Sequence, residues 1–410
     1  MTETSSNQGV YFLSLSVENV RCFAEKQTLD LSDGSGRPAQ WTVILGDNGV
    51  GKTTLLEVLA NLMLRGDETH DWPRKNAQTF KVNYQLVFDS QINNSDRAFQ
   101  RQEITVDLNL YEGRAPENTR IYPYSASRRP LKNSAVRLRD TRSDIPDSPE
   151  ELINAEEWLL QIDYIVNRAS DPSIEHKYKQ RFTLIRETLI DLLPDLKDIR
   201  ISEPSETIPK PRVEFRTLDG WISLHKMSLG YQTMVAWMVD LAARLFDEYP
   251  NSPNPIVEPA VVLIDEIDLH LHPKWQRTIM AYLSERFVNT QFIVTAHSPL
   301  IVQAAENANI VVLKREGDSV KIHQHPQDVK GWRIDQLLTS DLFDLPSARS
   351  PHYENLLNQR RQILSQAQLT DTDQAKLSEL ECQIGELPTA ETPEDIDAMN
   401  IIRRAAELLK

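Results

Sequence analysis

Cysteine is almost absent from this chain of 410 residues. Only Cys22 and Cys382 occur, far apart, so the sequence has no CxxC pair and no cysteine spacing typical of a zinc site. Two isolated cysteines also exclude a disulfide framework. We therefore expect a reduced, cytoplasmic setting.

Long apolar runs are also absent. No run approaches the roughly 18 residues that span a bilayer. The N-terminal stretch MTETSSNQGV lacks the basic start and apolar centre of a secretory signal peptide. With 40% hydrophobic and 26% charged residues, the composition is that of an ordinary soluble globular protein, and we expect no membrane partner.

Basic side chains are in the minority. The 45 Lys and Arg residues against 60 Asp and Glu give a formal net charge of −15. This balance favours solubility and weighs against indiscriminate nucleic-acid binding, although a local basic patch can override the total.

Glycine is scarce, yet it is concentrated in one place. Of 13 glycines, three fall within the six positions from Gly46 to Gly51. They lie in ILGDNGVGKTTLLEVLA (44–60), between an apolar strand-like run and a helix-like run. The pattern Gly-x-x-x-x-Gly-Lys-Thr at 46–53 matches the phosphate-binding loop, in which glycines let successive backbone N–H groups curve around a phosphate.

This loop predicts ATP and Mg²⁺ as ligands. Lys52 is expected to reach the β- and γ-phosphates, and the hydroxyl of Thr53 is expected to bind Mg²⁺. A glycine-rich turn that merely precedes a helix is the structural alternative, but both flanks and the Gly-Lys-Thr ending disfavour it. The predicted ATP-binding residues are Gly46, Asp47, Asn48, Gly49, Val50, Gly51, Lys52, Thr53 and Thr54.

Apolar periodicity predicts strands and helices that alternate in the second half of the chain. This alternation favours a largely parallel sheet. From Trp332 onward the pattern is helical and charged. Strands are expected at 11–23, 41–46, 82–88, 104–110, 120–124, 199–202, 212–217, 221–224, 260–265, 290–297 and 309–316, and helices at 52–65, 149–168, 174–193, 231–247 and 274–287.

Two acidic residues follow a buried strand in AVVLIDEID (260–268). At the carboxyl end of this strand, Asp265 is expected to support Mg²⁺ and Glu266 to accept a proton from the attacking water. Taken alone, such an ending also fits a solvated strand edge. His297 follows the next strand, 32 residues after Asp265, and a lone histidine there can be incidental.

A segment rich in arginine, SASRRPLKNSAVRLRDTR (125–142), lies in a polar stretch that we expect to be a loop or a mobile arm. Three interpretations stay open: the arginines bind nucleic acid, they are solvated, or one of them reaches ATP. The arginines are Arg128, Arg129, Arg137, Arg139 and Arg142.

The order of these motifs resembles that of the ABC ATPases, in which a Ser-x-Gly-x-Gln segment lies between the phosphate loop and the Asp-Glu pair. The SMC and RecF-like branch, a group of AAA-family ATPases, is more similar than the transporters. VENVRCF (17–23) resembles the RecF-like opening motif, and DEIDLHLHPKWQ (265–276) is typical of RecF-like and overcoming-lysogenization-defect-like ATPases. RIDQLLTSDLFDLPSARSP (333–351) further resembles the stand-alone ATPases of bacterial anti-phage systems, such as the Septu ATPase.

The resemblance implies a fold and a division of the chain. The fold is α/β: a P-loop NTPase of the ABC/SMC-head type, with a mostly parallel sheet, an N-terminal antiparallel portion, a helical insert and a helical C-terminal tail. The expected domains are the N-terminal part of the ATPase head, the arginine-rich loop with the insert, the C-terminal part of the head and the tail, at 8–125, 126–198, 199–325 and 326–410.

The resemblance also implies roles for single residues. Glu266 would be the catalytic carboxylate and His297 a switch histidine that senses the γ-phosphate, while Thr53 and Asp265 would hold the metal. A glutamine on a strand end after the first helix normally binds Mg²⁺ as well, and the sequence leaves it open among Gln85, Gln91, Gln100 and Gln102.

A second copy of the chain would complete the site. Ser228, Gly230 and Gln232 match the signature that closes on the ATP of a partner subunit, and Asp268 and His272 fall in a segment that lines the dimer interface. The implied function is an ATPase that dimerises on ATP and switches a separately encoded nuclease or toxin in anti-phage defence. A RecF-like repair ATPase that binds DNA directly is the alternative, and a transporter cassette is disfavoured by the degenerate signature.

Overall fold

The structure is a computed structural model, and it describes most of the chain. The described residues are 9–61, 73, 80–92, 96–107, 111–112, 116, 118–130, 151–193, 195–204, 209–324, 329–366 and 370–384. They divide into two units, Met1–Leu337 and Leu338–Lys410. The finer division into four domains stays a prediction.

A six-stranded sheet with the order β16-β15-β3-β14-β13-β7 lies at the centre of the larger unit. Every neighbouring pair is parallel except β15 and β16, so the predicted parallel sheet is confirmed. Residues of β13 and β14 are buried throughout, which explains their continuous apolar runs. The strands are β3 (Trp41–Gly46), β7 (Ile121–Tyr124), β13 (Ala260–Ile264), β14 (Thr290–Thr295), β15 (Asn309–Glu316) and β16 (Ser319–Gln324).

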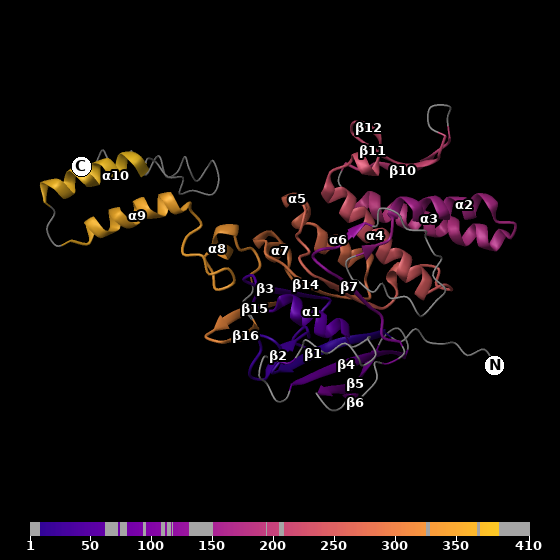
Figure 1. The fold of residues 1–410 in the computed structure, drawn as a ribbon, viewed down its shortest axis with the longest axis horizontal. Coiled ribbons are helices and arrows are strands. Elements are labelled where there is room, and N and C mark those ends of the chain that lie inside the picture. Colours follow the sequence, from indigo (N-terminus) through magenta and orange to yellow (C-terminus); the bar gives the residue numbers. More distant parts are fainter. Residues whose placement is uncertain are drawn as a thin grey trace. The chain divides into compact units, whose positions relative to one another are not determined.

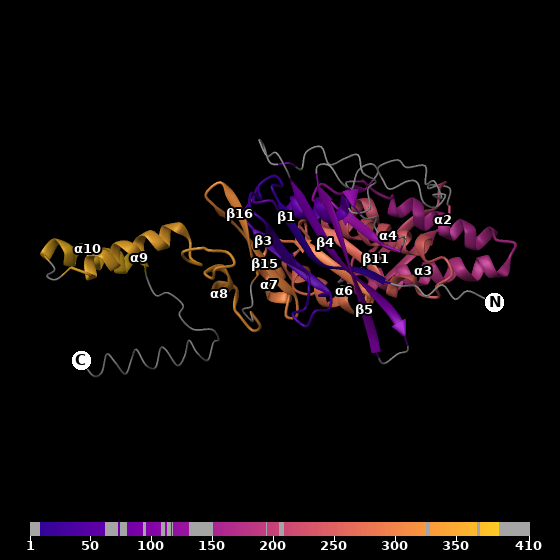
Figure 2. The same ribbon diagram turned by 90° about the horizontal axis from the view of Figure 1, so that it is seen from below.

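An antiparallel sheet with the order β2-β1-β4-β5-β6 forms the N-terminal portion. Helix α1 (Lys52–Ala60) lies between the two sheets (Figure 1) and buries Leu55, Val58 and Leu59 in their shared core. Figure 2 shows the long strands β1, β4 and β5 of this sheet from its outer side. The strands are β1 (Gly9–Glu18), β2 (Gln27–Asp30), β4 (Lys81–Ile92), β5 (Asp96–Asp107) and β6 (Tyr111–Glu112).

The insert contains two helices that run side by side and pack on the long helix α4 (Figure 1). The prediction of a helix from Pro149 was wrong at its start, because Asn154 caps α2 by accepting from the N–H groups of Glu156 and Glu157. The helices and strands of the insert and of the segment that follows it, up to α4, are β8 (Arg129–Pro130), β9 (Glu151–Leu152), α2 (Ala155–Arg168), α3 (Pro172–Leu192), β10 (Asp198–Ser202), β11 (Arg212–Thr217), β12 (Gly220–Ser223) and α4 (Leu229–Glu248).

The helix predicted at 274–287 is two helices in the structure. It breaks at Arg277 and Thr278, which separate α5 (Pro273–Gln276) from α6 (Ile279–Arg286). Short 3₁₀ helices at Leu224–Lys226 and Pro255–Val257, and α7 (Pro299–Ala304), complete the connections.

The smaller unit is helical, as predicted. Its helices α9 (Pro351–Leu364) and α10 (Asp371–Ile384) bury Leu356, Ile363 and Leu380 against one another. Helix α8 (Ile334–Leu338) precedes them. None of the described helices combines the length and the hydropathy that a membrane span requires.

A buried polar network ties β7 to α4. Asp240 of α4 is fully buried and accepts from the hydroxyl of Tyr124 at 3.0 Å and from the N–H of Ile153 at 3.0 Å. Arg244 donates to the same carboxylate at 2.5 Å. The backbone oxygen of Tyr124 in turn accepts from the N–H of Asp265 at 2.8 Å, so this network supports the strand end that carries the acidic pair.

Candidate functional site

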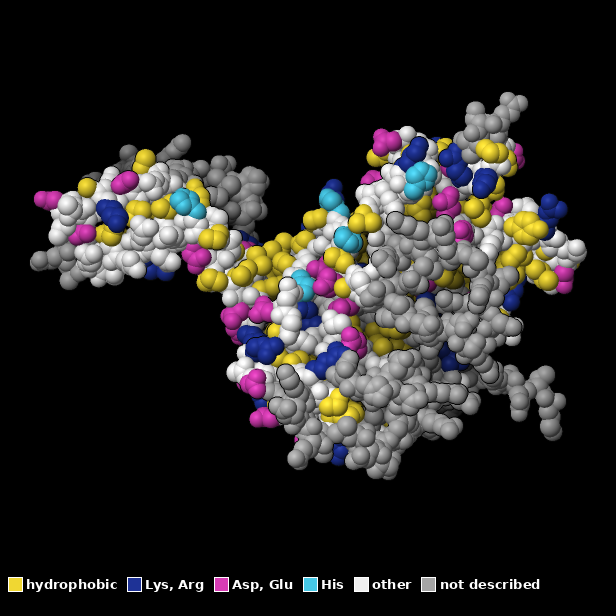
Figure 3. All heavy atoms as spheres, in the orientation of Figure 1, with side chains coloured by type: hydrophobic (Ala, Val, Ile, Leu, Met, Phe, Trp, Pro, Cys, Tyr) yellow, Lys and Arg dark blue, Asp and Glu magenta, His cyan; other side chains and the backbone are white. Residues whose placement is uncertain are grey.

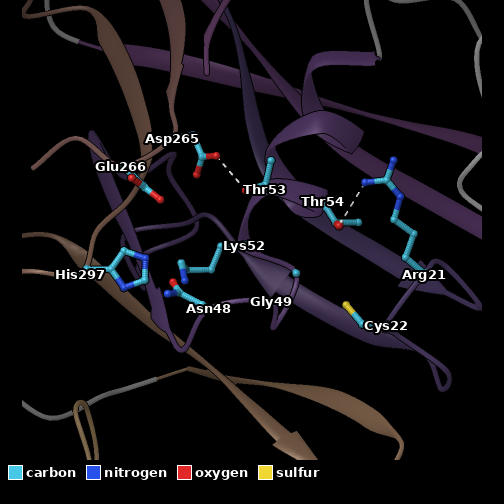
Figure 4. Close-up of a pocket in the computed structure, with 11 residues that line it drawn as sticks. Arg21, Cys22, Asn48, Gly49, Lys52, Thr53, Thr54, Asp265, Glu266 and His297 are labelled. Carbon is cyan, nitrogen blue, oxygen red and sulfur yellow. Dashed lines mark hydrogen bonds between the residues drawn. The ribbon is translucent and has the colours of Figure 1, made fainter. Parts of the chain in front are cut away.

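A pocket of about 380 Å³ lies at the carboxyl edge of the parallel sheet. It forms there because β3, β14 and β13 are neighbours in the sheet, so the segments that follow these strands meet at one edge. Figure 4 shows Asp265, Glu266 and His297 facing the phosphate loop. The described residues that line the pocket are Arg21, Cys22, Asn48, Gly49, Gly51, Lys52, Thr53, Thr54, Asp265, Glu266 and His297.

The side chain of Lys52 folds back over its own loop. Its Nζ donates to the backbone oxygens of Gly46 and Asp47, each at 2.8 Å. Burial lowers the pKa of Lys52, and the nearby carboxylates of Asp265 and Glu266 counteract this. The ammonium group is therefore held inside the loop, and Lys52 lines the pocket.

Gly51 shows why the loop needs glycine. Its φ is +95°, a left-handed conformation that side chains rarely adopt, and an added Cβ would lie 2.4 Å from the Sγ of Cys22. Cys22 and Arg21 come from the turn that follows β1. Arg21 donates to the hydroxyl of Thr54 at 3.3 Å and pairs with Glu57 of α1, so this turn also forms a wall of the pocket.

Thr53 and Asp265 meet directly across the pocket. The Thr53 hydroxyl donates to Oδ2 of Asp265 at 2.8 Å, although 212 residues separate them in sequence. The other carboxylate oxygen, Oδ1, accepts from the hydroxyl of Thr295 at 2.6 Å. A hydroxyl and a carboxylate side by side are the hard oxygen ligands that Mg²⁺ prefers, so these two residues fit a metal shared with phosphates.

Glu266 has an uncommon backbone conformation, with φ at +52°. Its N–H donates to the hydroxyl of Thr295 at 2.7 Å, so one threonine orients both acidic residues. Thr295 was not predicted as a site residue, because a threonine inside TQFIVT is also an ordinary strand-forming residue.

His297 is exposed and lies shortly after the end of β14. Its backbone N–H donates to Oδ2 of Asp268 at 3.2 Å, which links it to the segment after the acidic pair. His272, further along that segment, is exposed, and its Nδ1 accepts from the N–H of Lys274 at the start of α5.

The signature residues lie away from the pocket of their own chain. None of the three, Ser228, Gly230 and Gln232, is among the described residues that line it. Ser228 is exposed at the start of α4, and Gln232 donates to the backbone oxygen of Met227 at 2.7 Å. An added Cβ at Gly230 would lie 2.5 Å from the backbone oxygen of His270, so glycine allows α4 to approach the segment after the acidic pair.

The glutamines considered for Mg²⁺ binding are all in the antiparallel sheet. Gln85 of β4 is exposed and accepts from Ser14 at 3.2 Å, and Gln102 of β5 is exposed as well. The side chains of Gln91 and Gln100 lie outside the described ones. The strand that ends beside Asp265 is β7, and Ser125 follows it.

The arginine-rich stretch begins inside the site. Arg128 is buried, with 8% of its surface exposed, and it donates to backbone oxygens of the acidic pair. Of the three interpretations left open for the stretch, a solvated side chain and a contact with nucleic-acid phosphates are both disfavoured for Arg128, because the residue is buried. The structure does not describe the side chain of Arg129. It also does not describe residues 131–150, which include Arg137, Arg139 and Arg142.

Charged side chains gather around the site on the surface as well. In Figure 3, acidic, basic and histidine side chains meet on the face over α1, α5 and α7. Among the described residues no three His, Cys, Asp or Glu side chains converge as a metal site. Thr53 and Asp265, whose oxygens lie side by side, could supply protein ligands for Mg²⁺, with phosphate and water oxygens as the other ligands.

The sheet order, the phosphate loop and the acidic strand end together define a P-loop NTPase of the ABC/SMC type. Residues 41–303 match the family described as "AAA domain, putative AbiEii toxin, Type IV TA system". This match covers more than half of the chain, and the chain belongs to this family.

The chain is also similar to curated proteins. A region of 158 residues is 38% identical to "Retron Ec83 probable ATPase" of Escherichia coli and covers 38% of this chain and 28% of that protein. A region of 333 residues is 28% identical to "Septu protein PtuA" of Bacillus mycoides (strain KBAB4) and covers 77% of this chain and 42% of that protein. The matched regions thus span less than half the length of these two relatives.

Among solved structures, the chain is similar to the one described as "Crystal structure of the SmcHead bound to the C-winged helix domain of ScpA". The identity is 17% and the TM-score 0.45, over 77% of this chain and 97% of that one. This likeness is distant.

Proposed function

We propose that this chain binds ATP with Mg²⁺ in the pocket and hydrolyses it to ADP and phosphate. The observation that carries the proposal is the direct hydrogen bond from Thr53 to Asp265, which brings the phosphate loop against the acidic strand end. Lys52 stands within the same loop with its ammonium group buried. Mg²⁺, when bound, would neutralise developing charge on the phosphate oxygens.

Glu266 would act as the general base. Its backbone is held by Thr295, while its side chain lines the pocket beside the loop (Figure 4). A carboxylate in this place can orient a water and accept its proton as the water attacks the γ-phosphate. His297, on the same side of the pocket, would contact the γ-phosphate from the end of β14.

We further propose that hydrolysis needs two copies of the chain. Ser228 is exposed and none of the signature residues lines the pocket of its own chain, so a second copy would have to supply the signature. Closure on ATP and reopening after hydrolysis would make the dimer a two-state switch.

Ser228→Arg tests the contribution of the signature across the dimer. We expect ATP binding to one chain to persist within about threefold, because Ser228 does not line the pocket, while turnover falls about 100-fold since the altered signature no longer contacts the ATP of the partner chain. Nucleotide titration and phosphate release measure the two effects. Loss of ATP binding in this variant would count against a signature that acts in trans, and Ser173→Arg, exposed at the start of α3 and outside the pocket lining, serves as the control.

The switch would act on a separately encoded nuclease or toxin in anti-phage defence. The likeness to the Septu protein and the retron ATPase supports this role, as does the tail resemblance at 333–351. The DNA-repair alternative has less support, because Arg128, the one arginine of the stretch whose side chain is described, is buried.

We expect the purified chain to cut no DNA by itself, because the residues proposed for its site bind and hydrolyse ATP and do not form a nuclease site. Cleavage or another toxic activity should appear only after the product of a neighbouring gene is added with ATP. A plasmid-nicking assay with and without that product measures this. Robust Mg²⁺-dependent cutting by the chain alone would contradict the effector role.

A further inference from the structure

Arg128 is a buried cation that the proposed steps do not use. It lies in the turn after β7, with its guanidinium placed under the acidic pair. Nη1 donates to the backbone oxygens of Asp265 at 2.7 Å and Ser125 at 3.1 Å, and Nη2 donates to the backbone oxygen of Glu266 at 3.1 Å. One planar group therefore joins the end of β7 to both acidic residues at the end of β13.

These bonds go to main-chain oxygens. The Asp265 carboxylate therefore stays available to Thr53 and Thr295, and the Glu266 carboxylate stays available to the pocket. Burial lowers the pKa of Arg128, and the nearby Asp265, Glu266 and Asp268 counteract the effect. The position is thus suited to an arginine that holds the main chain without occupying the carboxylates.

The peptide groups around Glu266 are held from two sides. Its N–H is bound by Thr295 and its carbonyl by Arg128, while its φ of +52° is a left-handed conformation. For a residue other than glycine this conformation is strained, so it persists only where neighbouring groups enforce it. Removing one of the two contacts would let the turn relax and redirect the Glu266 side chain.

We propose that Arg128 is a positioning residue that fixes the direction of the Glu266 carboxylate for ATP hydrolysis. The inference rests on the proposed hydrolysis reaction. Arg128 acts through the main chain of Glu266 and is expected to contribute to turnover far more than to nucleotide binding, because its described contacts are with this turn and not with the phosphate loop.

Arg128→Met is the main test, and Arg181→Met is a matched control. Arg181 is also 8% exposed and also donates to a backbone oxygen, that of Phe246 at 2.6 Å, but this oxygen belongs to α4 and not to the turn that carries the acidic pair. We expect Arg128→Met to lower kcat about 10- to 100-fold with ATP affinity changed less than about threefold. Arg181→Met should lower thermal stability and leave kcat within about twofold of wild type.

Arg128→Lys extends the test if the methionine variant folds poorly. Lysine keeps the positive charge but lacks the planar fork with which Arg128 contacts three backbone oxygens through two nitrogens, so kcat should lie between those of wild type and Arg128→Met. Equal kcat values for wild type and both Arg128 variants would overturn the inference. A parallel loss of ATP affinity would overturn it too, because Arg128 would then be part of nucleotide binding.

Hydrogen exchange of the peptide that covers 265–271 gives a readout without ATP. Faster exchange in Arg128→Met than in Arg181→Met is the expected result, and equal exchange would contradict the positioning role. Glu266→Gln is measured for turnover beside both variants. If wild type and Glu266→Gln turn over ATP at equal rates, the proposed function is contradicted. If Glu266→Gln lowers the rate of turnover but the Arg128 variants do not, only the present inference is contradicted.

Discussion

Replacing Lys52 with alanine is expected to abolish ATP binding and turnover. The Nζ of Lys52 is buried in the loop and held by two carbonyl groups at 2.8 Å, so its charge lies where the β- and γ-phosphates would bind. Removal of this charge should lower kcat/KM about 10²- to 10³-fold or more, because phosphoryl transfer depends on fixed positive charge. Titration with a fluorescent ATP analogue and a phosphate-release assay measure binding and turnover.

Lys197→Ala controls for the loss of a lysine. Lys197 is exposed in the connection before β10 and does not line the pocket, so its removal should leave both measurements unchanged. ATP hydrolysis at the parental rate in Lys52→Ala would mean that the phosphate loop at 46–53 is not the nucleotide site.

Glu266→Gln is expected to bind ATP without splitting it. The amide keeps the shape of the side chain but cannot accept a proton, and the loss of a general base typically costs 10²–10⁴-fold in rate, so kcat should fall by about that amount. The variant should then accumulate as an ATP-dependent dimer in size-exclusion chromatography with light scattering.

Glu258→Gln makes the same chemical change outside the pocket, just before β13, and should behave as wild type. A wild-type rate in Glu266→Gln would assign the base to another residue. A reduced rate without a dimer would retain the catalytic role and argue against closure on ATP.

Contiguous motifs made much of the site predictable. The phosphate loop and the Asp265–Glu266 pair are each short stretches of sequence, and a parallel sheet necessarily brings the ends of its strands to one edge. The residues that the sequence analysis missed, or interpreted differently, act through single contacts between distant elements. Thr295 belongs to an ordinary strand pattern, Arg128 stands in a polar stretch, and Cys22 lies in a turn near the N-terminus.

Errors at the ends of elements have similar causes. The helix expected from Pro149 starts later because Asn154 caps it, and residues 151–152 pair with β8 instead. Strand β16 (Ser319–Gln324) was not predicted, since its burial comes from pairing with β15 and not from a continuous apolar run. Periodicity reports which face is buried, whereas caps and edge pairings depend on tertiary neighbours.

A mixing experiment tests most directly whether two copies form the site. Lys52→Ala disables the phosphate loop and Ser228→Arg disables the signature, so each variant alone should be inactive. In a mixed dimer, the intact loop of one chain faces the intact signature of the other. Equal mixing should therefore restore activity, to at most about a quarter of the wild-type rate per chain if dimers form at random. A mixture as inactive as its two components would contradict an ATP site shared between two chains.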